Sequence, residues 1–153
     1  MRHITAALVL FSMPAAASDI RASELSLGGV ASGVTEASVL ELLGEPVERI
    51  ETGEGTELRY PGLAVTVGWL DQAAPGVERR VFALRADGNS ACTPSGLCPG
   101  MDEARTTELY GATEALVTDT ATLFEYQPEA IHCWLQVEVQ GGTIVSLAVA
   151  CQS

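Results

Sequence analysis

The stretch Gly33-Val-Thr-Glu-Ala-Ser-Val-Leu-Glu-Leu-Leu-Gly44 is followed later in the chain by a similar one, Gly100-Met-Asp-Glu-Ala-Arg-Thr-Thr-Glu-Leu-Tyr-Gly111. Both glycines, a Glu-Ala pair and a Glu-Leu pair coincide without a gap, and residues 56–60 align with residues 122–126 further on. Internal similarity at this scale is typical of repeat architectures. The sequence therefore predicts two tandem repeats, at about residues 25–91 and 92–153.

Each of the two stretches carries the signals of a short helix. Thr35 and Asp102 are good N-cap residues, and each is followed by a glutamate, whose charge is favourable at a helix N-terminus. Gly44 and Gly111 stand where a residue of left-handed conformation ends a helix. The predicted apolar stripe of the first helix is Val39, Leu40, Leu42 and Leu43.

Strict alternation of apolar residues predicts strands with one buried face at residues 63–69, where Trp69 is the last apolar position, and in a hairpin from Cys133 to Cys151. Gln140-Gly141-Gly142-Thr143 is a turn signal. Pairing Gln140 with Ile144 across a three-residue loop buries the apolar side chains of this hairpin on one face. The predicted fold is α+β, with two tandem helix-plus-antiparallel-hairpin repeats forming one sheet with helices on one face.

The four cysteines allow three disulfide pairings. The hairpin register sets Cys133 opposite Cys151, and directly opposed residues have Cβ atoms about 4.5–5.5 Å apart, close to disulfide reach. Cys92 and Cys98 then close a short loop that contains proline and glycine. The alternative is a four-cysteine zinc site, which favours close Cys-x-x-Cys pairs that this sequence lacks.

Residues 1–18 combine a basic start, an apolar core and a small-residue cleavage site, which is the pattern of a signal peptide. Its removal leaves a single predicted domain, residues 19–153. The first cysteine is Cys92, so a bacterial lipid anchor is not indicated, and no later apolar run is long enough to span a bilayer. The sequence predicts a periplasmic or secreted protein.

The chain is acidic, with a formal net charge of −12, and all eight of its basic residues are arginines. Such a charge repels nucleic-acid phosphates and anionic lipid headgroups, so neither is an expected partner. The acidic residues between Glu36 and Glu57 are dispersed, which favours a solvated face. The alternative interpretation is an acidic surface for an arginine-rich partner or a cation.

Residues with catalytic or metal-binding chemistry are sparse. His132 is the one histidine outside the predicted signal peptide, and no nucleophile motif accompanies it. The scattered carboxylates have no recognisable metal-ligand spacing. We therefore predict no catalytic residue, no metal site and no cofactor.

Aromatic residues outside the buried positions are the candidates for recognition. Trp134 projects to the strand face opposite Leu135, and Tyr60 and Tyr126, at matching repeat positions, share its even parity. Interfaces favour tyrosine and tryptophan. We predict Trp134, Tyr60 and Tyr126 as candidate protein-binding residues; the alternative is that both tyrosines are core residues whose hydroxyl groups bond locally.

The whole pattern resembles the repeat of the β-lactamase inhibitory protein family and is similar to the single-copy SmpA/OmlA (BamE) assembly lipoproteins. The residues that carry the resemblance are, in the first repeat, Gly33, Val39, Leu43, Gly44, Pro46 and Tyr60, and in the second Gly100, Met101, Gly111, Tyr126, Trp134 and Cys151. It implies an antiparallel sheet, flanked by helices, whose free face or loops bind another protein. The two-repeat layout favours the inhibitor-like architecture, although a shared fold does not carry a shared partner.

The predicted function is that of an exported, non-catalytic protein-binding module of the inhibitor-like type, with a hydrolase as one kind of target. The first alternative is a periplasmic envelope assembly or scaffold protein of the SmpA/OmlA type. The second alternative is a small secreted hydrolase with converging carboxylates or a functional His132.

Overall fold

The computed structural model describes residues 20–69 and 76–152, so the predicted signal peptide at residues 1–18 lies outside the described residues. Two α-helices are present, α1 (Glu36–Leu43) and α2 (Ala104–Tyr110), with a 3₁₀ turn η1 (Ala22–Glu24) before them. The strands are β1 (Ser26–Leu27), β2 (Val30–Ala31), β3 (Glu48–Glu51), β4 (Thr56–Tyr60), β5 (Leu63–Gly68), β6 (Arg80–Ala86), β7 (Ala115–Val117), β8 (Thr122–Tyr126), β9 (Cys133–Gln140) and β10 (Thr143–Cys151).

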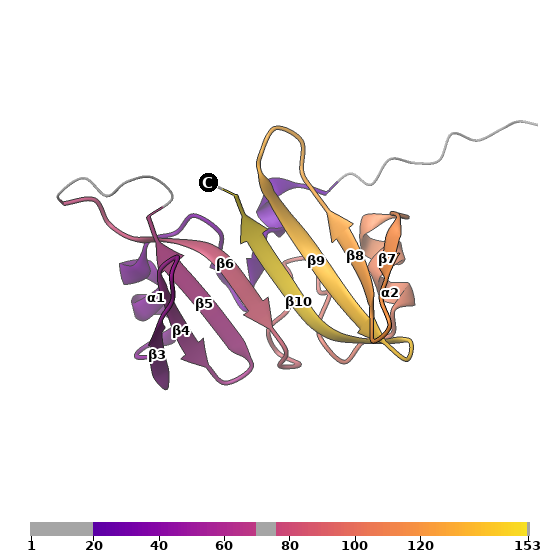
Figure 1. The fold of residues 1–153 in the computed structure, drawn as a ribbon, viewed down its shortest axis with the longest axis horizontal. Coiled ribbons are helices and arrows are strands. Elements are labelled where there is room, and N and C mark those ends of the chain that lie inside the picture. Colours follow the sequence, from indigo (N-terminus) through magenta and orange to yellow (C-terminus); the bar gives the residue numbers. More distant parts are fainter. Residues whose placement is uncertain (1–19, 70–75, 153) are drawn as a thin grey trace, which may run out of the picture.

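Eight of these strands form one antiparallel sheet in the order β3-β4-β5-β6-β10-β9-β8-β7. Strands β6 and β10 lie at its centre, and β3 and β7 form its two edges. In the view of Figure 1 both α-helices lie behind the sheet, and the short β1-β2 ribbon packs against β6 and β10. The architecture is therefore a broad antiparallel sheet with two short helices on one face.

The prediction of two tandem helix-plus-hairpin repeats is wrong. Strands account for 42% of the structure and helices for 14%, and the fold is not clearly two repeats. The apolar alternation of the sequence predicted hairpins. The charged segment β3 and the short segment β7 are also strands, because β3 pairs with β4 and β7 pairs with β8. The two central strands come from distant parts of the chain and bond to each other, which joins all eight strands into one sheet.

The two α-helices begin and end near the predicted residues. The Ser38 amide donates to Thr35 Oγ1 at the start of α1, and the Ala104 amide donates to Asp102 Oδ1 at the start of α2. Gly44 follows α1 with a φ of 78°, a value that glycine adopts without strain. The predicted stripe of α1 is narrower than expected, because only Val39 of this helix is buried.

The β9-β10 hairpin is tighter at its turn than predicted. Thr143 pairs with Gln140 across a two-residue Gly141-Gly142 turn, in place of the three-residue loop expected from the sequence. A bulge between Ile144 and Ser146 then shifts the register by one residue, so Leu147 faces Val137 as predicted. The bulge restores the pairing further along the hairpin and sets Cys151 opposite Cys133.

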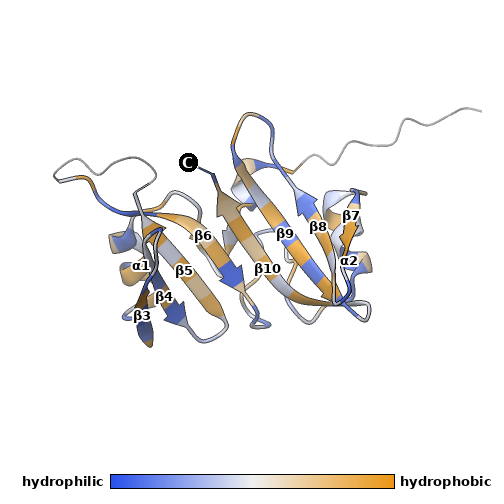
Figure 2. Cartoon of the chain, in the orientation of Figure 1, coloured by the Kyte–Doolittle hydropathy of each residue, from blue (hydrophilic) through white to orange (hydrophobic). Residues whose placement is uncertain are grey.

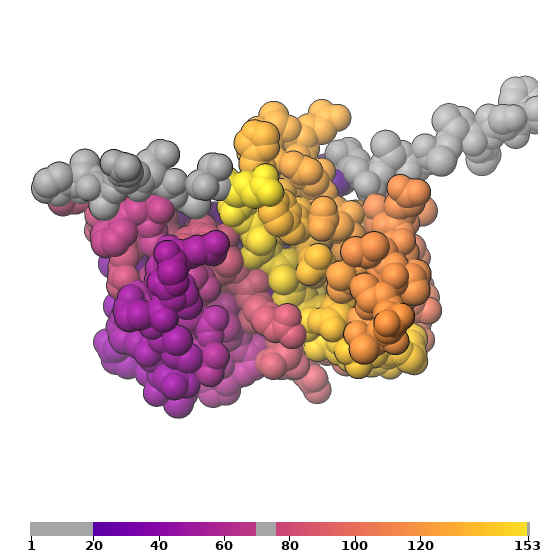
Figure 3. Space-filling view, in the orientation of Figure 1, coloured from indigo at the N-terminus to yellow at the C-terminus, as the bar shows by residue number. Residues whose placement is uncertain are grey.

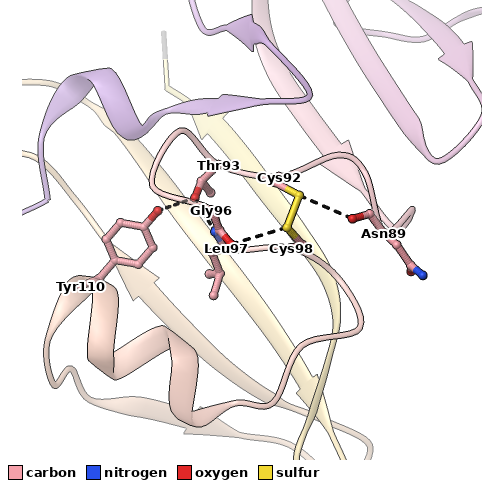
Figure 4. The surroundings of a disulfide bond; sticks show 7 residues. All are labelled: Asn89, Cys92, Thr93, Gly96, Leu97, Cys98 and Tyr110. Carbon is pink, nitrogen blue, oxygen red and sulfur yellow. Dashed lines mark hydrogen bonds between the residues drawn. A yellow bond between two sulfur atoms is a disulfide. The ribbon is translucent and has the colours of Figure 1, made fainter.

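The four cysteines form the disulfides Cys92–Cys98 and Cys133–Cys151, which match the predicted pairing. The first closes the loop that precedes α2 (Figure 4), and the second joins the ends of the β9-β10 hairpin. Disulfides of this kind fit an oxidising compartment. Among the described residues no helix has both the length and the apolar composition that crossing a membrane requires.

A single hydrophobic core lies between the sheet and the elements behind it. Leu58, Val65, Leu84, Leu135 and Val149 contribute to it from five strands, and each is at most 2% exposed. The alternating hydrophobic and hydrophilic bands along the strands in Figure 2 follow this arrangement. Because neighbouring side chains on a strand point to opposite faces, the residues between these positions project from the other side of the sheet.

A polar cluster fixes the loop of the Cys92–Cys98 disulfide to α2. The hydroxyl oxygen of Tyr110 lies 2.8 Å from Glu24 Oε2 and 2.6 Å from Thr93 Oγ1, and Ser95 Oγ donates to Glu24 Oε1. Figure 4 shows the Tyr110 ring reaching from α2 to this loop. The hydroxyl group of Tyr110 therefore connects three segments that are distant in the sequence.

Replacing Tyr110 with phenylalanine is expected to lower the free energy of unfolding by about 1–2 kcal/mol, because both hydrogen bonds are lost. Burial also raises the pKa of the Tyr110 hydroxyl, so the folded state holds this proton more tightly than the unfolded chain. The resulting stability is complete below the ordinary tyrosine pKa of about 10 and is lost as the pH rises above it. Urea denaturation of the natural chain and of Tyr110→Phe, at pH 7 and at alkaline pH, measures both effects. If the variant were as stable as the natural chain at pH 7 and lost as much stability at alkaline pH, this role of Tyr110 would be contradicted.

Candidate functional site

The face of the sheet that points away from the helices, here called the open face, is the candidate site. Its residues lie in two rows that cross the sheet through directly paired positions. The first row is Glu48, Arg59, Ala64, Arg85, Ala148, Gln136 and Glu125. The second row is Ile50, Glu57, Thr66, Ala83, Ala150 and Trp134. The face points toward the viewer in Figure 3.

Small side chains form the middle of the open face. On the strands β5, β6 and β10, every position of the two rows except Arg85 carries a small side chain. These positions are Ala64, Thr66, Ala83, Ala148 and Ala150. All five are partly exposed. Because these side chains are short, the backbone of the central strands lies close to the surface there. Another molecule can approach the sheet more closely at this floor than at the flanks.

Arg85 stands between Ala64 on β5 and Ala148 on β10, so small side chains flank it on both neighbouring strands. Its side chain is 62% exposed, and the nearest carboxylate oxygen, Glu138 Oε2, is 3.8 Å away. Arg59 is held differently, since it donates to Glu57 Oε1 at 2.6 Å and to Glu48 Oε2 at 3.4 Å. Of these two arginines, Arg85 has the weaker internal pairing and the greater exposure.

A shallow depression of about 400 Å³ lies beside these arginines. Four charged residues line it, together with residues at the β4-β5 turn: Glu57, Arg59, Arg85 and Asp87, with Tyr60, Gly62, Leu63 and Ala64. Charges of both signs line it, and it opens onto solvent over the strands β4 to β6. This geometry suits contact with polar side chains of a partner surface better than enclosure of a small apolar molecule.

The structure separates the three predicted recognition aromatics. Trp134 lies on the open face, partly exposed, and faces Ala150 on β10. Tyr60 and Tyr126 lie on the covered face, where their hydroxyl groups donate to the carbonyl oxygens of Gly44 and Gly111 at 2.9 Å. Tyr126 is 1% exposed and cannot reach a partner in this fold. Even numbering in different strands does not define a common face, because strand register decides it.

His132 is exposed in the loop that enters β9, and its carbonyl oxygen accepts a hydrogen bond from the Gln152 amide. Within residues 20–69 and 76–152, no three histidine, cysteine, aspartate or glutamate side chains are grouped so that they could hold a metal ion. The sequence did not single out Arg85 or the alanines around it. Arg85 projects outward because its neighbours Leu84 and Ala86 are buried, and its central position depends on the pairing of β6 with β10.

The fold and the site together define an antiparallel-sheet protein with one covered face and one open face. The chain is similar in fold to a DUF4309 family protein from Bacillus subtilis, with a TM-score of 0.50, 13% identity, and coverage of 81% of this chain and 83% of that one. An extracellular SCP-domain protein from Bacillus anthracis gives a TM-score of 0.47 at 12% identity. That match covers 78% of this chain and spans 44% of the other.

No family model and no curated protein matches the sequence. At these low identities the similarity to the DUF4309 protein shows a shared fold alone. Neither structural neighbour belongs to the inhibitor-like or assembly-lipoprotein families that the sequence resembles. That resemblance stays a prediction.

Proposed function

We propose that this chain is an exported, non-catalytic binding protein that docks another protein on the open face of its sheet. The observation that carries the proposal is the placement of Arg85 and Trp134 around the same floor of small side chains. They lie two strand spacings apart across the sheet and two residues apart along it, which separates their backbones by about 12 Å. Arginine and tryptophan are the residue types that contribute most often to the energetic centre of protein interfaces.

The physical argument for docking concerns what each group offers to a partner. The alanine floor allows close approach, the Trp134 ring offers a large contact area with little loss of side-chain entropy, and Arg85 has several unused N–H donors. When Arg85 is buried against a carboxylate of the partner, water is removed from the ion pair. The paired hydrogen bonds between guanidinium and carboxylate then fix the orientation of the partner. The surrounding glutamates form a polar rim.

Export is supported by the leader-like residues 1–18 and by the two disulfides. The inhibitor-like role and a hydrolase target rest on the sequence resemblance alone. The envelope-assembly alternative rests on the same kind of likeness, and the hydrolase alternative rests on His132 and dispersed carboxylates.

The test is affinity capture from native periplasm or culture medium, with the mature chain and three single variants as baits. Arg85→Glu and Trp134→Ala alter the open face. Arg105→Glu makes the same charge change on α2, behind the sheet, at a residue that is also exposed. We expect a captured protein whose affinity for the first two variants falls about tenfold or more, with the Arg105→Glu variant unchanged.

A partner that binds Arg85→Glu and Trp134→Ala as tightly as the natural chain would contradict the proposed surface. Loss of the partner's hydrolytic activity on binding supports the inhibitor role, whereas co-purification with outer-membrane complexes without inhibition supports the assembly role. Hydrolysis by the chain alone, abolished by His132→Ala, would overturn the non-catalytic assignment.

A further inference from the structure

The two edges of the large sheet differ in how they are protected. Edge strand β3 has the sequence Glu48-Arg-Ile-Glu51, and charged side chains of this kind disfavour pairing with another chain. Edge strand β7 is Ala115-Leu-Val117, without a charge. Leu116 is 63% exposed and Val117 is 73% exposed, although both are large apolar residues. In Figure 3 this strand lies in orange at the right-hand edge of the molecule.

The backbone of β7 has free hydrogen-bonding groups on its outer side. The Thr118 amide donates to the Ala121 carbonyl oxygen at 2.8 Å and closes the β7-β8 hairpin. Hydrogen-bonded pairs alternate along an antiparallel ladder, so the next one is Leu116 with Leu123. The N–H and C=O groups of Ala115 and Val117 therefore point away from β8, and no described strand pairs with that side.

The charge around β7 is negative and uncompensated. No arginine or lysine follows Arg105 in the sequence, whereas six carboxylates do. Glu114 and Asp119 flank the strand, and Glu125 lies on the adjacent strand β8; all three are exposed. None of the three forms an ion pair among the described residues, in contrast to the carboxylates near β3, which pair with Arg49 and Arg59.

We propose that the β7 edge binds an extended, cationic segment of another protein, which adds a ninth strand to the sheet. The partner segment has an aliphatic or β-branched centre that covers Leu116 and Val117, and arginines or lysines on both sides that meet Glu114 and Asp119. Backbone hydrogen bonds from Ala115 and Val117 supply affinity, and the flanking charges supply specificity and orientation. This edge adjoins the open face, since Glu125 belongs to the first row of that face, and its binding of a strand adds to the proposed function.

A second copy of the chain is a poorer occupant, because each copy carries a formal net charge of −12 and the two edges would bring like charges together. A strand with basic ends removes that repulsion. Its binding is therefore expected to weaken steeply as salt is added.

The test uses the mature chain and a labelled peptide, Arg-Arg-Val-Ile-Val-Thr-Arg-Arg, with binding followed by fluorescence anisotropy. A peptide with glutamate in place of each arginine, and one with proline in place of isoleucine, are the controls. We expect binding of the first peptide alone, with a chain that stays monomeric in sedimentation. No binding of the basic peptide, or equal binding of all three, would overturn the proposal.

Two variants locate the binding to the edge. Val117→Pro removes an outward N–H donor and leaves the ladder to β8 intact, so the affinity should fall about tenfold or more. Glu51→Pro is the matched control, because Glu51 precedes a hairpin closed by the same kind of bond, from the Thr52 amide to the Gly55 carbonyl oxygen. Equal loss in both variants, or no loss in Val117→Pro, would contradict the assignment.

Charge reversal keeps the test informative if the proline variant folds poorly. Glu114→Lys combined with Asp119→Lys changes two exposed side chains, and we expect this double variant to reject the basic peptide and to bind the glutamate peptide. Retained preference for the basic peptide would overturn the proposal. If the natural chain formed a dimer and Val117→Pro abolished it, the edge would bind a second copy of the chain, and the proposal of a cationic partner would be overturned.

Discussion

Truncation of Leu135 to alanine is expected to lower the free energy of unfolding by about 3–5 kcal/mol. Leu135 is fully buried in β9 and faces Val149 on β10 and Tyr126 on β8, so bonded strands hold the cavity on both of its flanks. A sheet that is bonded on both sides cannot collapse into the space that the side chain leaves. Denaturation in urea, monitored by circular dichroism, measures this loss.

The matched control is Gln136→Ala, the next residue on the same strand. Gln136 projects from the open face, so its truncation should change the free energy of unfolding by about 0.5 kcal/mol or less. If both variants lost the same stability, the assignment of the two sheet faces would be wrong.

Replacement of Cys133 and Cys151 together by alanine is expected to cost about 3 kcal/mol of stability. The disulfide joins residues 18 apart in the sequence and ties the end of the chain to β9, so its loss frees more of the unfolded chain than loss of the shorter Cys92–Cys98 link, with a separation of 6. We therefore expect a smaller cost, about 2 kcal/mol, for the Cys92 and Cys98 double replacement.

Thermal unfolding of both double variants tests this order. The Cys133 and Cys151 variant should melt roughly 10 °C below the natural chain, and the other variant should melt in between. The reverse order would show that the loop before α2 holds more of the stability than the β9-β10 hairpin does. A reducing agent added to the natural chain should reproduce the sum of the two effects.

Local signals in the sequence predicted local structure well. Thr35 and Gly44 bound the first helix because capping depends on a few adjacent residues. The β9-β10 pairing and its disulfide were predictable because one register buries the apolar side chains and opposes the cysteines. The turn itself was predicted one residue too long, because a bulge at Val145 that the pattern does not reveal compensates for the shorter loop.

Other predictions failed where the outcome depends on distant residues. Trp69 continues the alternation of β5 but is 47% exposed, because the strand ends at Gly68 and the Trp69 Nε1 group donates to the Val77 carbonyl oxygen outside the sheet. Tyr60 and Tyr126 matched Trp134 in numbering, yet the register of their strands turns them toward the covered face.

The sequence by itself predicted which residues of β5, up to Gly68, and of the β9-β10 hairpin share a face, where the helices begin and end, and which cysteines pair, because these depend on periods and caps within short segments. The tertiary structure alone decided that β6 lies beside β10, that Arg85 therefore stands among alanines, and that β7 is left as an uncharged edge. The physical reason is that the order of strands in a sheet follows from burying the apolar surface of the whole chain. No single segment carries that information.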